Sequence, residues 1–278
     1  MAENEAIVGS KSFTAVAVNC ASKAGEWIKS RIGRVAEPDL KMSLHDLVTE
    51  VDKGSERLIR NLIGTHFPEH SFLGEEGVEP GPEASVKALQ QVSSEEYLWI
   101  VDPIDGTTNY VHGFPFFSVS IALAHRGQVI VGVVYDPSRD ELFVAERGKG
   151  AYVHGRRMQV SGEKTLAQSL VATGFPAEHQ LALPGNLKQI QALAPKVRNL
   201  RTAGSAALHL AYVAAGRLSG FWEIGLNAWD MAAGALLVEE AGGKVTGLAG
   251  EPYHLGVRDV VATNGLIHDE LVGELRQA

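Results

Sequence analysis

The sequence predicts a single compact α/β domain in which helices and sheets form layers. The first part of the chain has the apolar repeat of amphipathic helices, residues 117–153 have the two-residue period of an antiparallel meander, and helices and strands alternate after that. No low-complexity linker joins the two halves, residues 1–155 and 156–278. We therefore expect one compact domain over residues 1–278.

The first half begins with helices. Apolar residues recur at helical spacing over residues 13–28, which predicts a long amphipathic helix. A second apolar repeat, residues 51–63, follows Thr49, a favoured N-cap residue. A short strand is expected at residues 70–73. The Pro, Gly and Ser residues between 78 and 96 predict a loop with at most a helical turn.

Tight turns divide the meander into strands. Arg126-Gly127 and the Asp-Pro-Ser sequence at 136–138 are turn sequences. The strands are expected at residues 118–124, 129–135 and 141–145.

The second half alternates between the two element types. An alanine-rich stretch favours a helix, and Gly242-Gly243 is typical of a helix end. The expected elements are helices at 181–193, 205–215, 230–241 and 268–276, and strands at 221–223 and 259–263.

Composition excludes several classes of protein. The chain has 278 residues and a formal net charge of −8, which argues against a broad nucleic-acid-binding surface. It has no apolar run long enough to span a membrane, and its acidic first residues do not resemble a signal peptide. The single cysteine, Cys20, excludes an intrachain disulfide and a cysteine-rich zinc site. We expect a cytoplasmic protein without membrane segments.

Acidic residues from separate segments form the most informative pattern. Asp102 and Asp105 follow an apolar strand at a spacing of three residues, where two carboxylates repel each other unless a cation lies between them. Glu75 and Asp230 are further candidate ligands, and the carbonyl of Ile104 is another oxygen donor. Each acid alone is explained as a turn residue, a helix-start residue or a solvated side chain. Together they favour a site for Mg²⁺.

Two glycine-containing turns are candidate phosphate-binding sites. Gly106 and Thr107 follow the second aspartate, and their amides are expected to form a concave nest for an anion. Gly204 and Ser205 precede Ala206 at the start of a helix, whose free amides also favour an anion. At this second turn, simple helix capping by Ser205 explains the residues at least as well.

Several motifs at matching spacing resemble one known family. They are Gly74-Glu75-Glu76, residues 99–110, Trp229-Asp-Met-Ala-Ala-Gly234 and Ala241-Gly-Gly243. The chain thus resembles the inositol monophosphatase family over most of its length. The resemblance implies a layered α-β-α-β-α sandwich of the inositol monophosphatase and fructose-1,6-bisphosphatase type, a homodimer, two or three Mg²⁺ ions and sensitivity to lithium.

The resemblance also implies residue roles. Thr107 would orient the attacking water with Asp52 behind it, Lys41 would lie near the phosphate, and Glu223 would bind substrate hydroxyls. From the sequence alone, an exposed edge position for Glu223 is an equal alternative. The implied metal ligands are Glu75, Asp102, Ile104, Asp105 and Asp230, with Glu75 also catalytic; the implied substrate contacts are Lys41, Ile104, Asp105, Gly106, Thr107, Gly204, Ser205, Ala206, Glu223 and Asp230.

The expected reaction is hydrolysis of a small phosphate monoester, inositol 1-phosphate, to myo-inositol and phosphate by a metal-activated water. Gly113 and Asn227-Ala228 depart from the pattern of several relatives, which leaves the substrate open. Histidinol phosphate, fructose 1,6-bisphosphate and a 3′-phosphoadenosine nucleotide are alternatives on the same scaffold. A different alternative is a regulatory protein that binds the transcription apparatus. A structural metal-binding domain without chemistry would leave Thr107 and the anion nests without a role.

Overall fold

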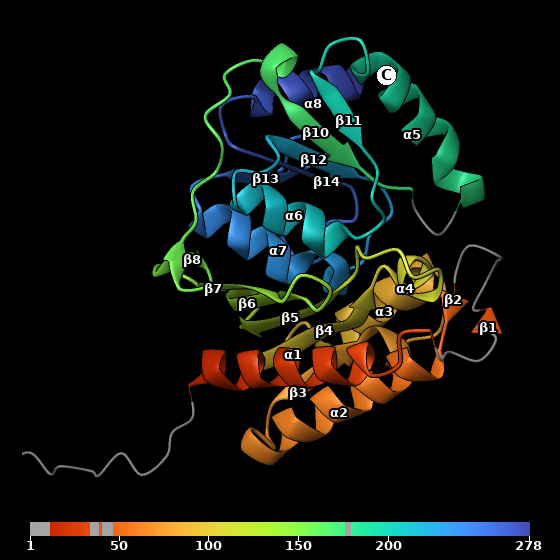
Figure 1. The fold of residues 1–278 in the computed structure, drawn as a ribbon, viewed down its shortest axis with the longest axis vertical. Coiled ribbons are helices and arrows are strands. Elements are labelled where there is room, and N and C mark those ends of the chain that lie inside the picture. The colour runs from red at the N-terminus through yellow and green to blue at the C-terminus, as the bar shows by residue number, and fades with distance from the viewer. Residues whose placement is uncertain (1–11, 34–38, 41–46, 176–178) are drawn as a thin grey trace, which may run out of the picture.

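A computed structural model describes residues 12–33, 39–40, 47–175 and 179–278. The elements form five layers, with helices α1 and α2, a seven-stranded sheet, helices α6 and α7, a five-stranded sheet, and helices α5 and α8 in that order (Figure 1). The predicted α-β-α-β-α sandwich is thereby confirmed. In the described part of the chain, no helix is long and apolar enough to cross a membrane.

The seven-stranded sheet has the order β3-β4-β5-β6-β7-β8-β9. The first pair, β3 and β4, is parallel, and the remaining pairs are antiparallel, as the two-residue period predicts for the meander. The strands are β3 (Ser71–Gly74), β4 (Tyr97–Asp105), β5 (Ser118–His125), β6 (Gln128–Asp136), β7 (Glu141–Glu146), β8 (Gly150–Val153) and β9 (Arg156–Arg157).

The five-stranded sheet has the order β11-β10-β12-β14-β13, so β11 and β13 are its edges. Strand β10 is parallel to both β11 and β12, whereas β14 is antiparallel to its two neighbours. The strands are β10 (Leu170–Thr173), β11 (Asn199–Arg201), β12 (Gly220–Glu223), β13 (Lys244–Gly247) and β14 (Val260–Thr263). A separate two-stranded sheet pairs β1 (Asp39–Leu40) with β2 (Leu47–Val48).

Side chains cap the first turn of several helices. Ser12 accepts a hydrogen bond from the amide of Ala15 at the start of α1, and Thr49 and Asp52 form a capping box at the start of α2. The helices are α1 (Phe13–Lys29), α2 (Glu50–His66), α3 (Pro82–Val92), α4 (Thr107–Val111), α5 (His179–Leu193), α6 (Ala206–Ala214), α7 (Ala228–Glu240) and α8 (His268–Gln277), with 3₁₀ turns η1 (Glu75–Gly77) and η2 (Leu166–Gln168).

Within the described residues, three apolar cores lie between the layers. One lies between α1, α2 and the seven-stranded sheet, and another lies between the five-stranded sheet and α5 and α8. The largest core surrounds α6 and α7 between the two sheets. Small residues allow close approach there: a Cβ atom on Gly132 of β6 would lie 2.7 Å from the carbonyl oxygen of Ala233 in α7. This contact places α7 directly on the seven-stranded sheet.

Two of the sequence predictions for elements were wrong. Residues 78–96 are mainly the helix α3, because Pro82 occupies the first turn, where its missing N–H costs no hydrogen bond. Helix α7 begins at Ala228, so Asp230 is its third residue rather than its first. Short strands such as β10 and β11 were not predicted, since apolar runs of three or four residues carry no distinctive period.

Candidate active site

Backbone pairing brings the first acidic segments together. Gly74 at the end of β3 lies beside Val101 of β4 in a parallel register. Glu75 and Asp102 are the next residues along the two parallel strands. They therefore lie side by side at the same end of the sheet. Glu75 begins the turn η1, which ends β3 at this point.

A register shift in β4 separates Asp102 from Asp105. Asp102 pairs with Ser120 of β5 and Asp105 pairs with Ser118, so three residues of β4 span two residues of its neighbour. The amide of Ile104 donates to the Asp102 carboxylate at 2.9 Å and stabilises this irregular turn. The shift alters the regular alternation of side chains between the two acids.

The start of α7 contacts the same strands. The Ser120 hydroxyl donates to the carbonyl oxygen of Trp229 at 3.0 Å, which holds the first turn of α7 against β5. Asp230 follows, and its carboxylate accepts a hydrogen bond from the amide of Asn227 at 2.7 Å. Asp230 thus serves both as a helix cap and as a neighbour of the β4 acids.

The electrostatics of these acids are dominated by burial and by one another. Burial first, and then the charges of Glu75, Asp105 and Asp230, hold the pKa of Asp102 well above its usual range. The pKa of Asp230 is likewise raised by burial and by Asp105 and Glu75. Asp102 is within hydrogen-bonding reach of both Glu75 and Asp230. Among the described residues, the charges that act most strongly on Asp102 are those of other acids.

The donor set of this cluster suits a hard divalent cation. Burying carboxylates without a counter-charge costs several kcal/mol per ion, and oxygen ligands are those that Mg²⁺ prefers. Among the residues that the structure describes, however, no three His, Cys, Asp or Glu side chains have the geometry of a formed ion site. The metal ligands therefore stay a prediction.

Asp105 is bound by the start of α6. Its carboxylate accepts hydrogen bonds from the Ser205 hydroxyl at 2.5 Å and from the amides of Ala207 at 2.8 Å and Ala206 at 3.3 Å. Burial raises the pKa of Asp105 to about 6, and these three donors limit the rise. The amides predicted as a second phosphate nest therefore already bind a carboxylate of the protein itself.

Thr107 and Asp52 are also in contact. The Thr107 hydroxyl lies 3.1 Å from the Asp52 carboxylate and 3.1 Å from the carbonyl oxygen of Ile104. The amide of Thr49 donates to the other Asp52 oxygen at 2.8 Å. Burial raises the pKa of Asp52, and the hydrogen bond from the Thr49 side chain opposes that rise. The predicted Thr107–Asp52 pair is therefore present in the structure.

Gly106 and Asn109 join the two halves of the chain. Gly106 has a φ of 96°, and a Cβ atom there would lie 2.8 Å from the carbonyl oxygen of Gly204. The Asn109 side-chain amide donates to the carbonyl oxygens of Phe116 and Ala203, both at 2.6 Å. Sequence reasoning assigned no role to Asn109, because its partner Ala203, which follows β11, is distant in the chain.

Glu223 ends β12, an interior strand, and is only 7% exposed. The edge position that the sequence left open is therefore wrong. Burial, and then Asp105 and Asp230, hold the pKa of Glu223 well above its usual range. A Cβ atom on Gly174 would lie 2.1 Å from the Glu223 carboxylate, so a side chain at this position would displace that carboxylate.

Helix α5 supports both neighbours of Glu223. The Asn186 amide donates to the carbonyl oxygen of Gly174 at 2.8 Å, and Gln189 accepts from the Trp222 indole at 2.9 Å. Neither Asn186 nor Gln189 carried a signal in the sequence, since both read as ordinary helix residues. Lys41, the remaining predicted contact, lies outside the described residues.

Comparisons with known proteins agree on one family. A sequence profile of the inositol monophosphatase family matches residues 10–278. The chain is 44% identical to "Nus factor SuhB" of Pseudomonas aeruginosa, over 90% of each chain. It is 43% identical to "Inositol monophosphatase 2" of Solanum lycopersicum, over 96% of this chain and 99% of the relative. The structure of the inositol monophosphatase from Anabaena (Nostoc) superposes with a TM-score of 0.82 at 39% identity, covering 96% of both chains.

Proposed function

The chain belongs to the inositol monophosphatase family and is a phosphoric monoester hydrolase; from this premise, we propose that it releases phosphate from inositol 1-phosphate with Mg²⁺ as its cofactor. The observation that carries the cofactor proposal is the set of buried acids around Asp102, whose strongest charged neighbours are all carboxylates. We also propose that the protein is a cytoplasmic homodimer that lithium inhibits.

The proposed cofactor would be held by the oxygen donors of the cluster. When bound, a divalent cation offsets their negative charge and lowers the pKa of a coordinated water. The proposed ligands are Glu75, Asp102, the carbonyl of Ile104, Asp105 and Asp230.

The protein's own groups would orient the reactants. The Thr107 hydroxyl donates its hydrogen to Asp52. The Thr107 oxygen can then accept a hydrogen bond from the attacking water. The amides of Gly106 and Thr107 are proposed to bind the phosphate. Glu223 is proposed to bind substrate hydroxyls, because it lies at the same end of the cluster and is influenced by Asp105 and Asp230.

Phosphate release tests this proposal directly. We expect release from inositol 1-phosphate with Mg²⁺ and none after treatment with EDTA. Asp102→Asn should lower kcat by at least about a hundredfold, because it removes one charge from the proposed cation site. A matched control is Asp136→Asn, a buried aspartate of the same sheet outside the cluster, which should keep kcat within a few-fold. Unchanged turnover by Asp102→Asn would contradict the proposed metal site.

A substrate panel tests the choice of ester. Inositol 1-phosphate should give the highest kcat/KM among inositol 1-phosphate, histidinol phosphate, fructose 1,6-bisphosphate and a 3′-phosphoadenosine nucleotide. A higher value for another member would reassign the substrate while leaving the phosphatase proposal intact.

One relative favours a second candidate function. The similarity to "Nus factor SuhB" supports a role as a protein partner of the transcription apparatus. If the chain has this role, the Asp102→Asn variant should bind a purified transcription elongation complex as tightly as the unaltered protein. Absence of binding by both proteins would refute this candidate.

A further inference from the structure

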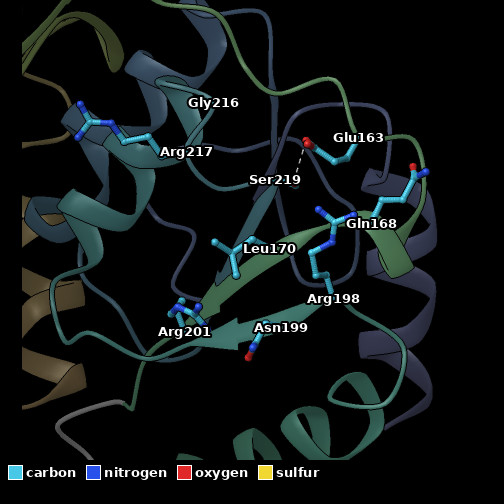
Figure 2. A pocket seen from close by; sticks show the side chains of 9 residues that line it. All are labelled: Glu163, Gln168, Leu170, Arg198, Asn199, Arg201, Gly216, Arg217 and Ser219. Carbon is cyan, nitrogen blue, oxygen red and sulfur yellow. Dashed lines mark hydrogen bonds between the residues drawn. The ribbon is translucent and has the colours of Figure 1, made fainter.

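A pocket with a volume of about 320 Å³ lies beside β11, an edge strand of the five-stranded sheet (Figure 2). It is formed by the edge strand β11, the start of β10, the turn after α6 and the segment around η2. The lining residues are Glu163, Gln168, Leu170, Arg198, Asn199, Arg201, Gly216, Arg217 and Ser219.

This pocket is separate from the carboxylate cluster. Ser219 precedes β12 and lines the pocket, whereas Glu223 ends the same strand beside the cluster. Four residues of extended chain span roughly 13 Å. None of the acids of the carboxylate cluster lines the pocket. The kind of ligand that it binds therefore depends on its own side chains.

Arginines dominate the charge of the pocket, but they are not equivalent. Arg217 is engaged elsewhere: its guanidinium donates to Glu141 at 2.6 Å, and Figure 2 shows it directed away from the pocket. Arg198 and Arg201 form no ion pair within the part of the chain that the structure describes. Arg201 donates only to the carbonyl oxygen of its neighbour Leu200, at 2.8 Å. Two guanidinium groups are thus available to an anion.

The pocket holds a single acid, Glu163, beside Arg198. Glu163 accepts a hydrogen bond from the Ser219 hydroxyl at 3.1 Å, and the Arg198 guanidinium points toward both residues (Figure 2). Hydrogen bonds from Ser161 and Ser219, with a smaller effect of the Arg198 charge, lower the pKa of Glu163. The two positive charges of Arg198 and Arg201 exceed the one negative charge of Glu163, so the pocket has a net positive charge of one.

The remaining walls suit a small polar molecule. Asn199 adds a polar side chain, whose carbonyl oxygen accepts a hydrogen bond from the amide of Leu200 at 2.8 Å. Leu170 adds an apolar surface. Gly216 fixes the turn after α6, since a Cβ atom there would lie 2.8 Å from the carbonyl oxygen of Gln159. The pocket therefore has one wall fixed by close packing rather than by flexible side chains.

We propose that this pocket binds a small phosphate ester that carries hydroxyl groups. Guanidinium groups recognise phosphate through paired, charge-assisted hydrogen bonds, so Arg198 and Arg201 would hold the phosphate. Glu163 accepts hydrogen bonds and would bind hydroxyls of the ligand next to the phosphate. The volume is at the lower end of the range for small-molecule sites, which matches a phosphorylated sugar or polyol rather than a nucleic acid.

Calorimetric titration in EDTA tests the proposal, because chelation removes the cations through which the carboxylate cluster would bind phosphate. Glucose 6-phosphate is the probe, and glucose and inorganic phosphate are the two partial ligands. We expect saturable binding of glucose 6-phosphate, weaker binding of inorganic phosphate and none of glucose. Arg198→Gln combined with Arg201→Gln should weaken binding by roughly tenfold or more. Arg156→Gln, an exposed arginine of β9 outside the pocket, should leave it unchanged.

A third variant separates the two ends of the ligand. Glu163→Gln should reduce the preference for glucose 6-phosphate over inorganic phosphate. The proposal is overturned if glucose 6-phosphate shows no saturable binding, or if it binds the double arginine variant as tightly as the unaltered protein while both have the same thermal unfolding midpoint. Because the titration needs neither Mg²⁺ nor turnover, its outcome is independent of the proposed phosphatase reaction.

Discussion

Replacing Ser205 with alanine tests how strongly the start of α6 stabilises the carboxylate of Asp105. The Ser205 hydroxyl donates to Asp105 at 2.5 Å and accepts from the amide of Leu208 at 3.3 Å, so it is also the N-cap of α6. Loss of an N-cap costs about 1 kcal/mol, and loss of a hydrogen bond to a charged group costs about 1.5–3 kcal/mol. Since Asp105 keeps two amide donors, we expect a total loss of about 2–4 kcal/mol.

Urea unfolding in EDTA, followed by tryptophan fluorescence, measures this loss as a change in the free energy of unfolding. Ser169→Ala is the matched control, because Ser169 is equally buried but donates only to the neutral carbonyl of Thr165, at 2.8 Å. Its expected cost is about 1 kcal/mol. The reasoning is refuted if Ser205→Ala costs no more than Ser169→Ala at an unchanged dependence on urea.

Three further predictions concern a histidine, a glycine and the cysteine. His209 is 1% exposed, neither ring nitrogen has a partner among the described residues, and burial lowers its pKa from 6.5 to about 3. Its neutral form therefore contributes stability that is complete above pH 6.5 and is lost as the pH falls toward 3. Between pH 7.5 and 5 this amounts to about 2 kcal/mol, and His209→Leu should remove that part of the loss in urea unfolding; equal losses would contradict the assignment. Gly174→Ala should displace Glu223 and lower kcat/KM for inositol 1-phosphate more than for p-nitrophenyl phosphate, which has no alcohol hydroxyls; equal effects would argue against the role of Glu223. Cys20 is fully buried with its pKa raised to about 12, so Ellman's reagent should react with it only after unfolding, and fast reaction with the folded protein would show the packing to be wrong.

Much of the fold could be predicted because long elements repeat their apolar residues many times. Helices α1 and α2 extend over 17 residues each, enough for the helical period to be evident. The strand β10 has four residues, and its identity depends on the partners β11 and β12 that flank it. Helix α3 was missed because Pro82 and nearby glycines resemble a loop until the helix start is known.

The candidate site likewise contains residues that could be predicted from the sequence and residues that could not. Asp102 and Asp105 could be recognised because their chemistry is unusual after a buried strand, and their motif is local. The donors that bind Asp105 could not be recognised, because the start of α6 is about a hundred residues away from Asp105 along the chain. Gly174 and Asn186 were also missed, because their importance lies in what they contact rather than in their own chemistry.

The attachment of Asp105 to α6 has a consequence during synthesis of the protein. A nascent chain displays Asp102 and Asp105 long before the ribosome has added residues 205–207. Until those residues arrive, Asp105 lacks the donors that they supply in the finished structure. If the finished protein holds cations at these acids, as proposed above, we expect an incomplete chain to bind them weakly, so that tight binding develops only when the second half docks.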